Sequence, residues 1–474
     1  MGSKSSSRLS SKNIQALILI FSAVVHLVTI VKEYAWADDW AFIAGYRTNS
    51  SEAKIEHIAG LRPILQVIMD QSFGRISQYE NLIFLRLVSL IGLLILIYRL
   101  MKLLREIGYS EFTVCSFGIL INFLPTFWIY TNWASTFSYT WACLFSLLSF
   151  NVFIRSKLLG LGLIISCFLI YQPAAVFSTF VAFAYLVKNG RLDDRNRLYL
   201  KFLVAGSFIG FLIGRLTGAI VGLPLKARTE IVDSPLELVE KIVWILTRPV
   251  LLSIRPFIIE SRGTLAAIFT VLGLSLAVLS LWQVSRRTGF SVINFSLTLI
   301  LVYAVGLLPL LVIAENQIEF RTLPATSCFG LLFVATGANF FFDKFWKSRG
   351  AITLVSFMVF LALLNYSHGK INFIFLDSFR QNYNFIKSSY SELNSSNQIV
   401  VLIDSIPWPQ SNSIGALSVK SDFQMPWVPI GAISQILRVA ENQVVVQVID
   451  DDEVVSLTDT IDLRRLREQL TNGK

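Results

Sequence analysis

Apolar stretches about 20 residues long recur along most of this 474-residue chain, and an α-helix of that length crosses the hydrocarbon core of a bilayer. Hydrophobic residues make up 54% of the sequence and charged residues only 15%, whereas soluble domains carry about 25% charge. The mean hydropathy is +0.62. A water-soluble core cannot bury this much apolar surface, so the sequence predicts an all-α polytopic membrane protein.

About eleven segments have the length and composition of a membrane span. They are 14–32, 82–100, 112–130, 137–154, 158–172, 173–187, 202–222, 264–282, 291–314, 323–342 and 351–366. We expect residues 1–366 to form the membrane domain, and residues 367–474, which regain polar character, to form a small α/β domain. In that second domain, 398–403 and 443–449 are predicted strands and 460–470 a predicted helix.

Basic residues predict the orientation of the chain, because short cytoplasmic loops are enriched in Lys and Arg. The basic clusters occupy every second loop, beginning at Lys4, Arg99, Arg155, Lys188, Arg286 and Lys344. These loops account for the net charge of +10 without a nucleic-acid-binding surface. We therefore expect a cytoplasmic N-terminus and an outer C-terminal domain. Two long loops, 33–81 and 223–263, are expected on the outer face. Each is expected to contain a helix in the interface plane, and the helix of the first loop is predicted over 57–73.

Two adjacent carboxylates, Asp38 and Asp39, follow the first apolar segment. Trp36 and Trp40 flank them, and Trp favours the membrane interface, so the pair is expected at head-group depth on the outer face. A carboxylate there can take a proton from a hydroxyl group. In extended backbone, adjacent side chains point to opposite sides, so one acid is expected to act as base while the other orients the loop or the acceptor.

Three further motifs fall on the same predicted face: Gly60-Leu61-Arg62-Pro63, Tyr171-Gln172-Pro173 and Arg321-Thr322-Leu323. The planar fork of Arg suits phosphate, which makes Arg62 and Arg321 candidate phosphate-binding residues. The wider set of candidates adds Tyr171, Gln172, Lys226 and Arg228 for binding, and Glu315 and Glu319 as secondary acids.

Structural roles stay open for each of these motifs. The acid pair can be a solvated turn, Arg62 and Pro63 can begin an interfacial helix, and Tyr171 can anchor a helix end at the interface. Arg321 can form a structural pair with Glu315 or Glu319.

Taken in order over residues 14–366, the four motifs resemble the GtrII-like glucosyltransferases that decorate bacterial O-antigen, which belong to the GT-C class. The resemblance implies a GT-C-like bundle in the bacterial inner membrane, a polyprenyl-phosphate sugar as donor, glucose as the sugar and a cell-surface glycan as acceptor. It also implies that Asp38 is the base and Asp39 supports it, because the family's acid lies early in this loop. The family has an Arg soon after the acids, whereas the next cation here is Arg47.

Two other functions stay open on the sequence. A transporter or lipid-linked-sugar flippase needs polar groups or broken helices near the midplane, whereas the motifs here gather at one interface. A non-catalytic envelope assembly factor would dock through its C-terminal domain. No cofactor is expected, although a carboxylate pair can hold a divalent ion. The four cysteines all lie in apolar runs and are predicted core residues.

Overall fold

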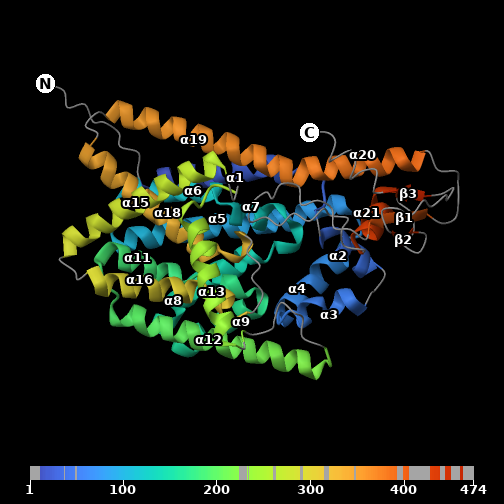
Figure 1. Cartoon of the computed structure of the whole chain (residues 1–474), viewed down its shortest axis with the longest axis horizontal. Helices are drawn as coiled ribbons and strands as arrows, with labels where there is room; N and C mark the ends of the chain where they lie inside the picture. The colour runs from blue at the N-terminus through green and yellow to red at the C-terminus, as the bar shows by residue number, and fades with distance from the viewer. Residues whose placement is uncertain are drawn as a thin grey trace.

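The computed structural model consists mainly of long helices that run side by side along the longest axis of the molecule (Figure 1). The structure describes residues 11–36, 38–47, 51–223, 232, 234–259, 263–288, 292–313, 320–345, 349–391, 399–404, 427–437, 444–449 and 460–462. Seven helices among these residues are long and apolar enough to cross a membrane. The chain is therefore a multi-pass, predominantly helical membrane protein, as its composition predicts.

Six of the seven spans centre on α1 (Ser11–Ile30), α5 (Leu82–Ile107), α8 (Tyr139–Arg155), α12 (Asp194–Ile220), α15 (Thr264–Thr288) and α18 (Pro324–Phe345). The seventh, Ser356–Ser388, begins in α19 (Arg349–Ile371) and continues beyond it. An eighth is formed if α6 (Glu111–Leu120) and α7 (Pro125–Asn132), which are bent by 55°, count as one span. Pro125 explains the bend, because proline lacks a backbone donor and keeps the preceding residue, Leu124, extended.

Three helices are too short to cross the hydrocarbon core, although they coincide with predicted spans. They are α9 (Lys157–Ile170), α11 (Thr179–Asn189) and α16 (Val292–Gly306). At a rise of 1.5 Å per residue they measure about 21, 17 and 23 Å, against a core of about 30 Å. The one-turn helices α10 (Gln172–Ala175) and α17 (Leu308–Val312) follow α9 and α16. Irregular backbone at this depth must be buried in protein or line a cavity.

The first long loop folds into α2 (Asp38–Arg47), α3 (Ser51–Ala59) and α4 (Pro63–Ser72). The prediction of one interfacial helix over 57–73 is wrong. The chain breaks at Leu61, whose φ of 61° is rare for a residue with a side chain, and Pro63 then starts α4. Leu61, Leu65 and Met69 are buried in the protein core, so the apolar face of this segment packs against protein.

The second long loop contains α13 (Pro235–Thr247) and α14 (Pro249–Ile254). In α13, Lys241 and Ile245 are buried, while Leu236, Val239 and Leu246 are exposed. Its ribbon runs across the direction of the long helices (Figure 1). Helix α13 thus runs across the long helices and turns an apolar face outward, as a helix in the interface plane is expected to do.

The C-terminal part begins inside a continuous helix. Helix α19 passes through a π-helical segment, Asn372–Asp377, into α20 (Ser378–Ser391), so the predicted boundary at residue 366 does not coincide with a helix end. Beyond it lie α21 (Trp427–Leu437) and the parallel strands β1 (Ile399–Asp404), β2 (Val444–Ile449) and β3 (Thr460–Asp462), in the order β2-β1-β3. Strand β3 occupies the start of the segment predicted as a helix over 460–470. Helix α21 packs against α2, which carries the acid pair (Figure 1).

Candidate functional site

A cavity of about 530 Å³ lies where the first loop meets the ends of the short helices. Its walls come from α2, α3 and the turn before α4, the turn before α8, the break between α9 and α10, helices α12 and α17, and the turn before α18. The cavity brings together five of the six predicted site residues that the structure describes, although they are far apart in sequence: Asp38, Arg62, Tyr171, Gln172 and Arg321.

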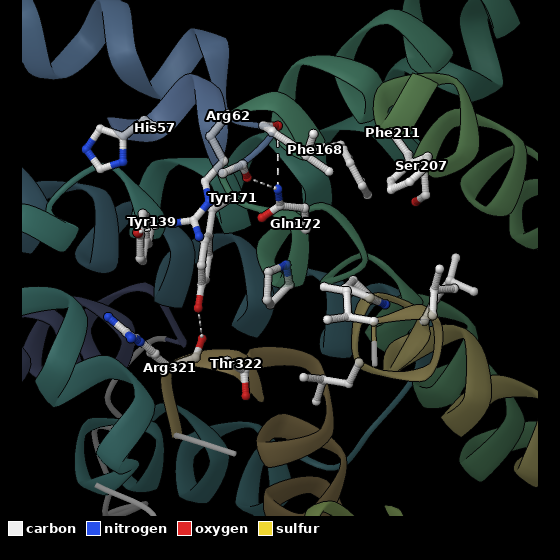
Figure 2. Close-up of a pocket in the computed structure, with 18 of the residues that line it drawn as sticks. His57, Arg62, Tyr139, Phe168, Tyr171, Gln172, Ser207, Phe211, Arg321 and Thr322 are labelled. Carbon is white, nitrogen blue, oxygen red and sulfur yellow. Dashed lines mark hydrogen bonds between the residues drawn. The ribbon is translucent and has the colours of Figure 1, made fainter. Parts of the chain in front are cut away.

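The cavity has a polar end and an apolar end. In Figure 2, Arg62, Tyr139 and Arg321 gather on one side, whereas Phe168 and Phe211 lie on the other. The apolar wall continues through α17 and through α12, where Phe208 lines the cavity although 62% of its surface is exposed. Because that residue belongs to both surfaces, the apolar end of the cavity meets the outer surface of the helix bundle.

Arg62 lies in the turn between α3 and α4. Its Nη1 donates to the hydroxyl of Tyr139 at 3.3 Å, and its Cζ lies 5.6 Å from the centre of the Tyr171 ring. Its Nε is buried and has no hydrogen-bond partner among the described residues. A buried guanidinium donor without a partner is costly, so an anion in the cavity would satisfy a group that the described residues leave unsatisfied.

Arg321 reaches the same polar end of the cavity from the direction opposite to Arg62 (Figure 2). It lies in a short 3-10 turn, Phe320–Thr322, that precedes α18. Its guanidinium lies over the ring of Trp133, with Cζ 4.8 Å from the ring centre. Its backbone carbonyl accepts hydrogen bonds from the hydroxyls of Tyr130 at 2.5 Å and Tyr171 at 3.1 Å. The backbone of this cation is thus held by two aromatic side chains from other helices.

The two adjacent acids have different surroundings. Asp38 lines the cavity, whereas Asp39 is fully buried and does not. Asp39 accepts a hydrogen bond at Oδ1 from the backbone N–H of Ser135 at 2.8 Å, and one at Oδ2 from that of Trp36 at 3.2 Å. The separation arises because both residues open helix α2, in which successive side chains diverge by about 100°, and not from the extended backbone that the sequence suggested.

Burial is the largest influence on Asp39 and raises the pKa of its carboxyl group from 3.8 to about 7. The charge of Arg86 and the two backbone N–H groups act in the opposite direction, while the charge of Asp38 adds to the increase. Near neutral pH this carboxyl group therefore binds a proton that a solvated Asp would release.

We expect Asp39 to make stability depend on pH. Because the pKa is raised in the folded state, the folded protein holds a proton that the unfolded chain releases, and stability falls as the pH rises from about 4 to about 7. The slope is at most about 1.4 kcal/mol per pH unit. Melting temperatures of wild type and Asp39→Asn, measured in detergent over this pH range, test the prediction. Only wild type should lose stability through the Asp39 carboxyl group as the pH rises. A difference between the two proteins that is constant over this pH range would contradict the assignment.

Arg86 was not among the predicted site residues, yet its charge has the largest effect of any neighbouring charge on Asp39. It lies in α5 and is 1% exposed. Its Nη1 donates to the carbonyl of Lys32 at 3.3 Å, its Nη2 to that of Tyr34, and its guanidinium lies 3.5 Å from the centre of the Tyr34 ring. A lone Arg inside an apolar segment is a signal for such a role, because buried charges in membrane helices are rare.

Several other lining residues were also not predicted: Glu56, His57, Ser135, Thr136 and Tyr139. Gln172, a predicted donor-binding residue, uses its Nε2 to donate to the carbonyls of Gly60 at 3.1 Å and Leu61 at 3.5 Å. Lys226, Arg228, Glu315 and Glu319 lie outside the described residues.

The described part of the chain contains no group of three or more His, Cys, Asp or Glu residues that could hold a metal ion. Cys143, Cys167 and Cys328 are buried and Cys115 is partly buried, in keeping with the predicted core positions. No protein-family model matches the sequence, and no curated protein matches it significantly.

Proposed function

We propose that this protein is an integral membrane glycosyltransferase of the GT-C class, which moves a sugar from a polyprenyl-phosphate donor to a hydroxyl group of a cell-surface glycan such as O-antigen. The amphipathic cavity carries the proposal. It offers Arg62 and Arg321 at one end and an apolar wall that meets the outer surface at the other, and Asp38 also lines it. A polyprenyl-phosphate sugar has the same division, with an anionic head joined to a hydrocarbon chain.

Each polar residue has a chemical task in this proposal. Asp38 takes the proton of the acceptor hydroxyl, whose oxygen forms a bond to the anomeric carbon of the sugar. The bond from that carbon to the phosphate oxygen breaks, and the polyprenyl phosphate leaves with the electron pair. Arg62 and Arg321 stabilise the charge on the departing phosphate, since their planar forks donate to two oxygens at once. Glucose as the transferred sugar rests on the resemblance in the sequence.

The proposed topology follows from the helices. The proposal counts eleven crossings, as in a GT-C-like bundle: the seven long spans, the bent pair α6–α7 and the three short helices, each of which is too short to cross alone and would be completed by adjoining irregular backbone. An odd number of crossings places the two ends of the chain on opposite sides. With the basic loops inside, the cavity and a C-terminal α/β domain lie on the outer face of the bacterial inner membrane. The C-terminal strands and α2 lie at the same end of the molecule, which agrees with this assignment (Figure 1).

A lipid-linked-sugar flippase is the second candidate, because helices interrupted within the membrane, such as α9 and α10, also occur in transporters. One experiment separates the two. Purified protein in detergent is incubated with a panel of polyprenyl-phosphate sugars and glycan acceptors, and released polyprenyl phosphate is measured. A transferase consumes donor without separate compartments, whereas a flippase does not. If wild-type protein that is folded consumes no donor in the panel, the proposed activity is rejected.

Arg62→Lys and Arg321→Lys are each expected to weaken donor binding roughly 10-fold or more, because a point charge replaces a paired donor and charged hydrogen bonds are lost. Donor affinity and turnover are measured on the purified variants. Arg75→Lys is the matched control, because Arg75 is exposed, lies outside the cavity and donates only weakly to Gln71 at 3.4 Å. Unchanged affinity and turnover in both cavity variants would rule out a phosphate-binding role.

A further inference from the structure

Tyr171 and Gln172 lie at the break between α9 and α10, and their side chains bond in opposite directions (Figure 2). The amide of Gln172 donates to the carbonyl of Gly60 at 3.1 Å, two residues before Arg62. The hydroxyl of Tyr171 donates to the carbonyl of Arg321 at 3.1 Å. Two neighbouring residues thus connect the backbone segments that carry the two cavity arginines, which are far apart in the sequence.

We propose that Tyr171 and Gln172 are positioning residues, which set the distance between the two guanidinium groups by holding the segments that carry them. The anion that the arginines would share is the donor phosphate, so this part rests on the proposed function. The claim about position concerns the protein alone and can be tested without the donor.

The backbone explains why adjacent residues reach opposite walls. Tyr171 is extended, with φ −158° and ψ 111°, and successive side chains of extended backbone point to opposite sides. Pro173 lies in the first turn of α10, where its missing backbone N–H would have no partner within the helix. Both side chains are largely buried, at 4% and 8% exposure, so their orientations are restricted by packing.

The segment that carries Arg62 needs this support. Leu61 is held at a φ of 61°, which costs about 1 kcal/mol or more for a residue with a side chain. Gln172 donates to the carbonyls of Gly60 and Leu61, on both sides of the Leu61 nitrogen and α-carbon. Gly214 of α12 allows the close approach, since a Cβ there would lie 3.0 Å from the Leu61 carbonyl oxygen.

The Tyr171 ring is fixed independently of its hydroxyl. It stacks on Tyr139 at a centroid distance of 3.7 Å and an angle of 3°, and Tyr139 also accepts the hydrogen bond from Arg62. Tyr171→Phe should therefore remove the bond to Arg321 and leave the stacked pair intact. Gln172→Met removes the donor while keeping an unbranched side chain of similar length, and Gln172→Glu, which keeps the shape, is a second variant.

Arginine-selective labelling tests the positions directly. Phenylglyoxal modification of each arginine in the full-length protein is followed by peptide mass spectrometry. Tyr171→Phe should change the labelling rate of Arg321 and not of Arg62, and the Gln172 variants should do the reverse, with Arg75 unchanged throughout. If neither arginine responds, or if both respond equally to both substitutions, the positioning role is wrong.

Double-mutant cycles extend the test to a ligand, with farnesyl phosphate as the probe and calorimetry as the readout. Tyr171→Phe and Gln172→Met should each lower the affinity for farnesyl phosphate roughly 2- to 10-fold, which corresponds to the loss of one neutral hydrogen bond. Tyr171→Phe should cause little further loss of affinity in a protein that already carries Arg321→Lys, but its full loss in one that carries Arg62→Lys. Gln172→Met should cause little further loss with Arg62→Lys and its full loss with Arg321→Lys. Additive effects in the matched pairs would overturn the proposal. If wild type fails to bind the probe while labelling stays selective, the proposed function fails and the positioning role stands.

Discussion

Replacing Asp38 with Asn is expected to lower the turnover of sugar transfer by roughly 10²- to 10⁴-fold, which is the usual contribution of a general base. Asparagine keeps the size of the side chain that lines the cavity but cannot take the acceptor proton. Donor affinity should stay near the wild-type value, because Arg62 and Arg321 are unchanged. The measurement is turnover and donor affinity on purified, folded protein.

Asp39→Asn is the matched control, because it makes the same chemical change at the next residue. Asp39 is fully buried and does not line the cavity, so its substitution should cost less in turnover. If Asp39→Asn is the more damaging, the two acids exchange roles. If neither substitution matters, the base lies elsewhere, and the next candidates are Glu56, which lines the cavity, and Glu315 and Glu319, which the structure does not describe.

Replacing Arg86 with Met is expected to reduce the free energy of unfolding by roughly 3 to 5 kcal/mol, the cost of removing one partner from a buried charged arrangement. The substitution removes the donors to the Lys32 and Tyr34 carbonyls and the positive charge that favours ionised Asp39. Thermal and denaturant unfolding in detergent would measure the loss. Arg86→Lys should recover part of it, because it keeps the charge without the planar fork.

Arg105→Met is the control for Arg86, since it removes an Arg from the same helix near its other end. Arg105 is 20% exposed and pairs with the exposed Glu111, so its loss should cost less than about 1 kcal/mol. Combining Arg86→Met with Asp39→Asn should restore some stability, because the second change removes the uncompensated acid. If Arg86→Met costs no more than the control, Arg86 does not hold the acid segment.

The sequence predicted most of the long apolar helices, and it predicted that several polar motifs lie at one end of the bundle, for a physical reason. Each motif follows or precedes an apolar run, and counting crossings placed all of them at one end of the bundle. Asp38, Arg62, Tyr171 and Arg321 do line one cavity in the structure. Their chemical roles stay predictions, as does the identity of the donor.

The short helices, the break at Leu61 and the role of Arg86 depend on tertiary contacts, which hydropathy does not predict. Predicted spans 158–172 and 173–187 became the short helices α9 and α11, with Tyr171 and the one-turn helix α10 between them, because apolar content does not reveal how deep a helix ends. The break at Leu61 requires an unusual φ that no local pattern specifies. Arg86 bonds to carbonyls more than 50 positions away, so its role became visible only when α5 and the first loop were placed together.

The contact between α2 and α21 has a consequence for the order in which the molecule is completed. Helix α2 leaves the ribosome well before α21, which packs against it and is separated from it in the chain by the spans α5 to α19. The acid-bearing helix thus lacks part of its support until those spans and α21 have been made. The cavity therefore reaches its final form only after α21 has been synthesised. A product truncated before α21 would keep its membrane spans but lack the support that α21 gives to α2.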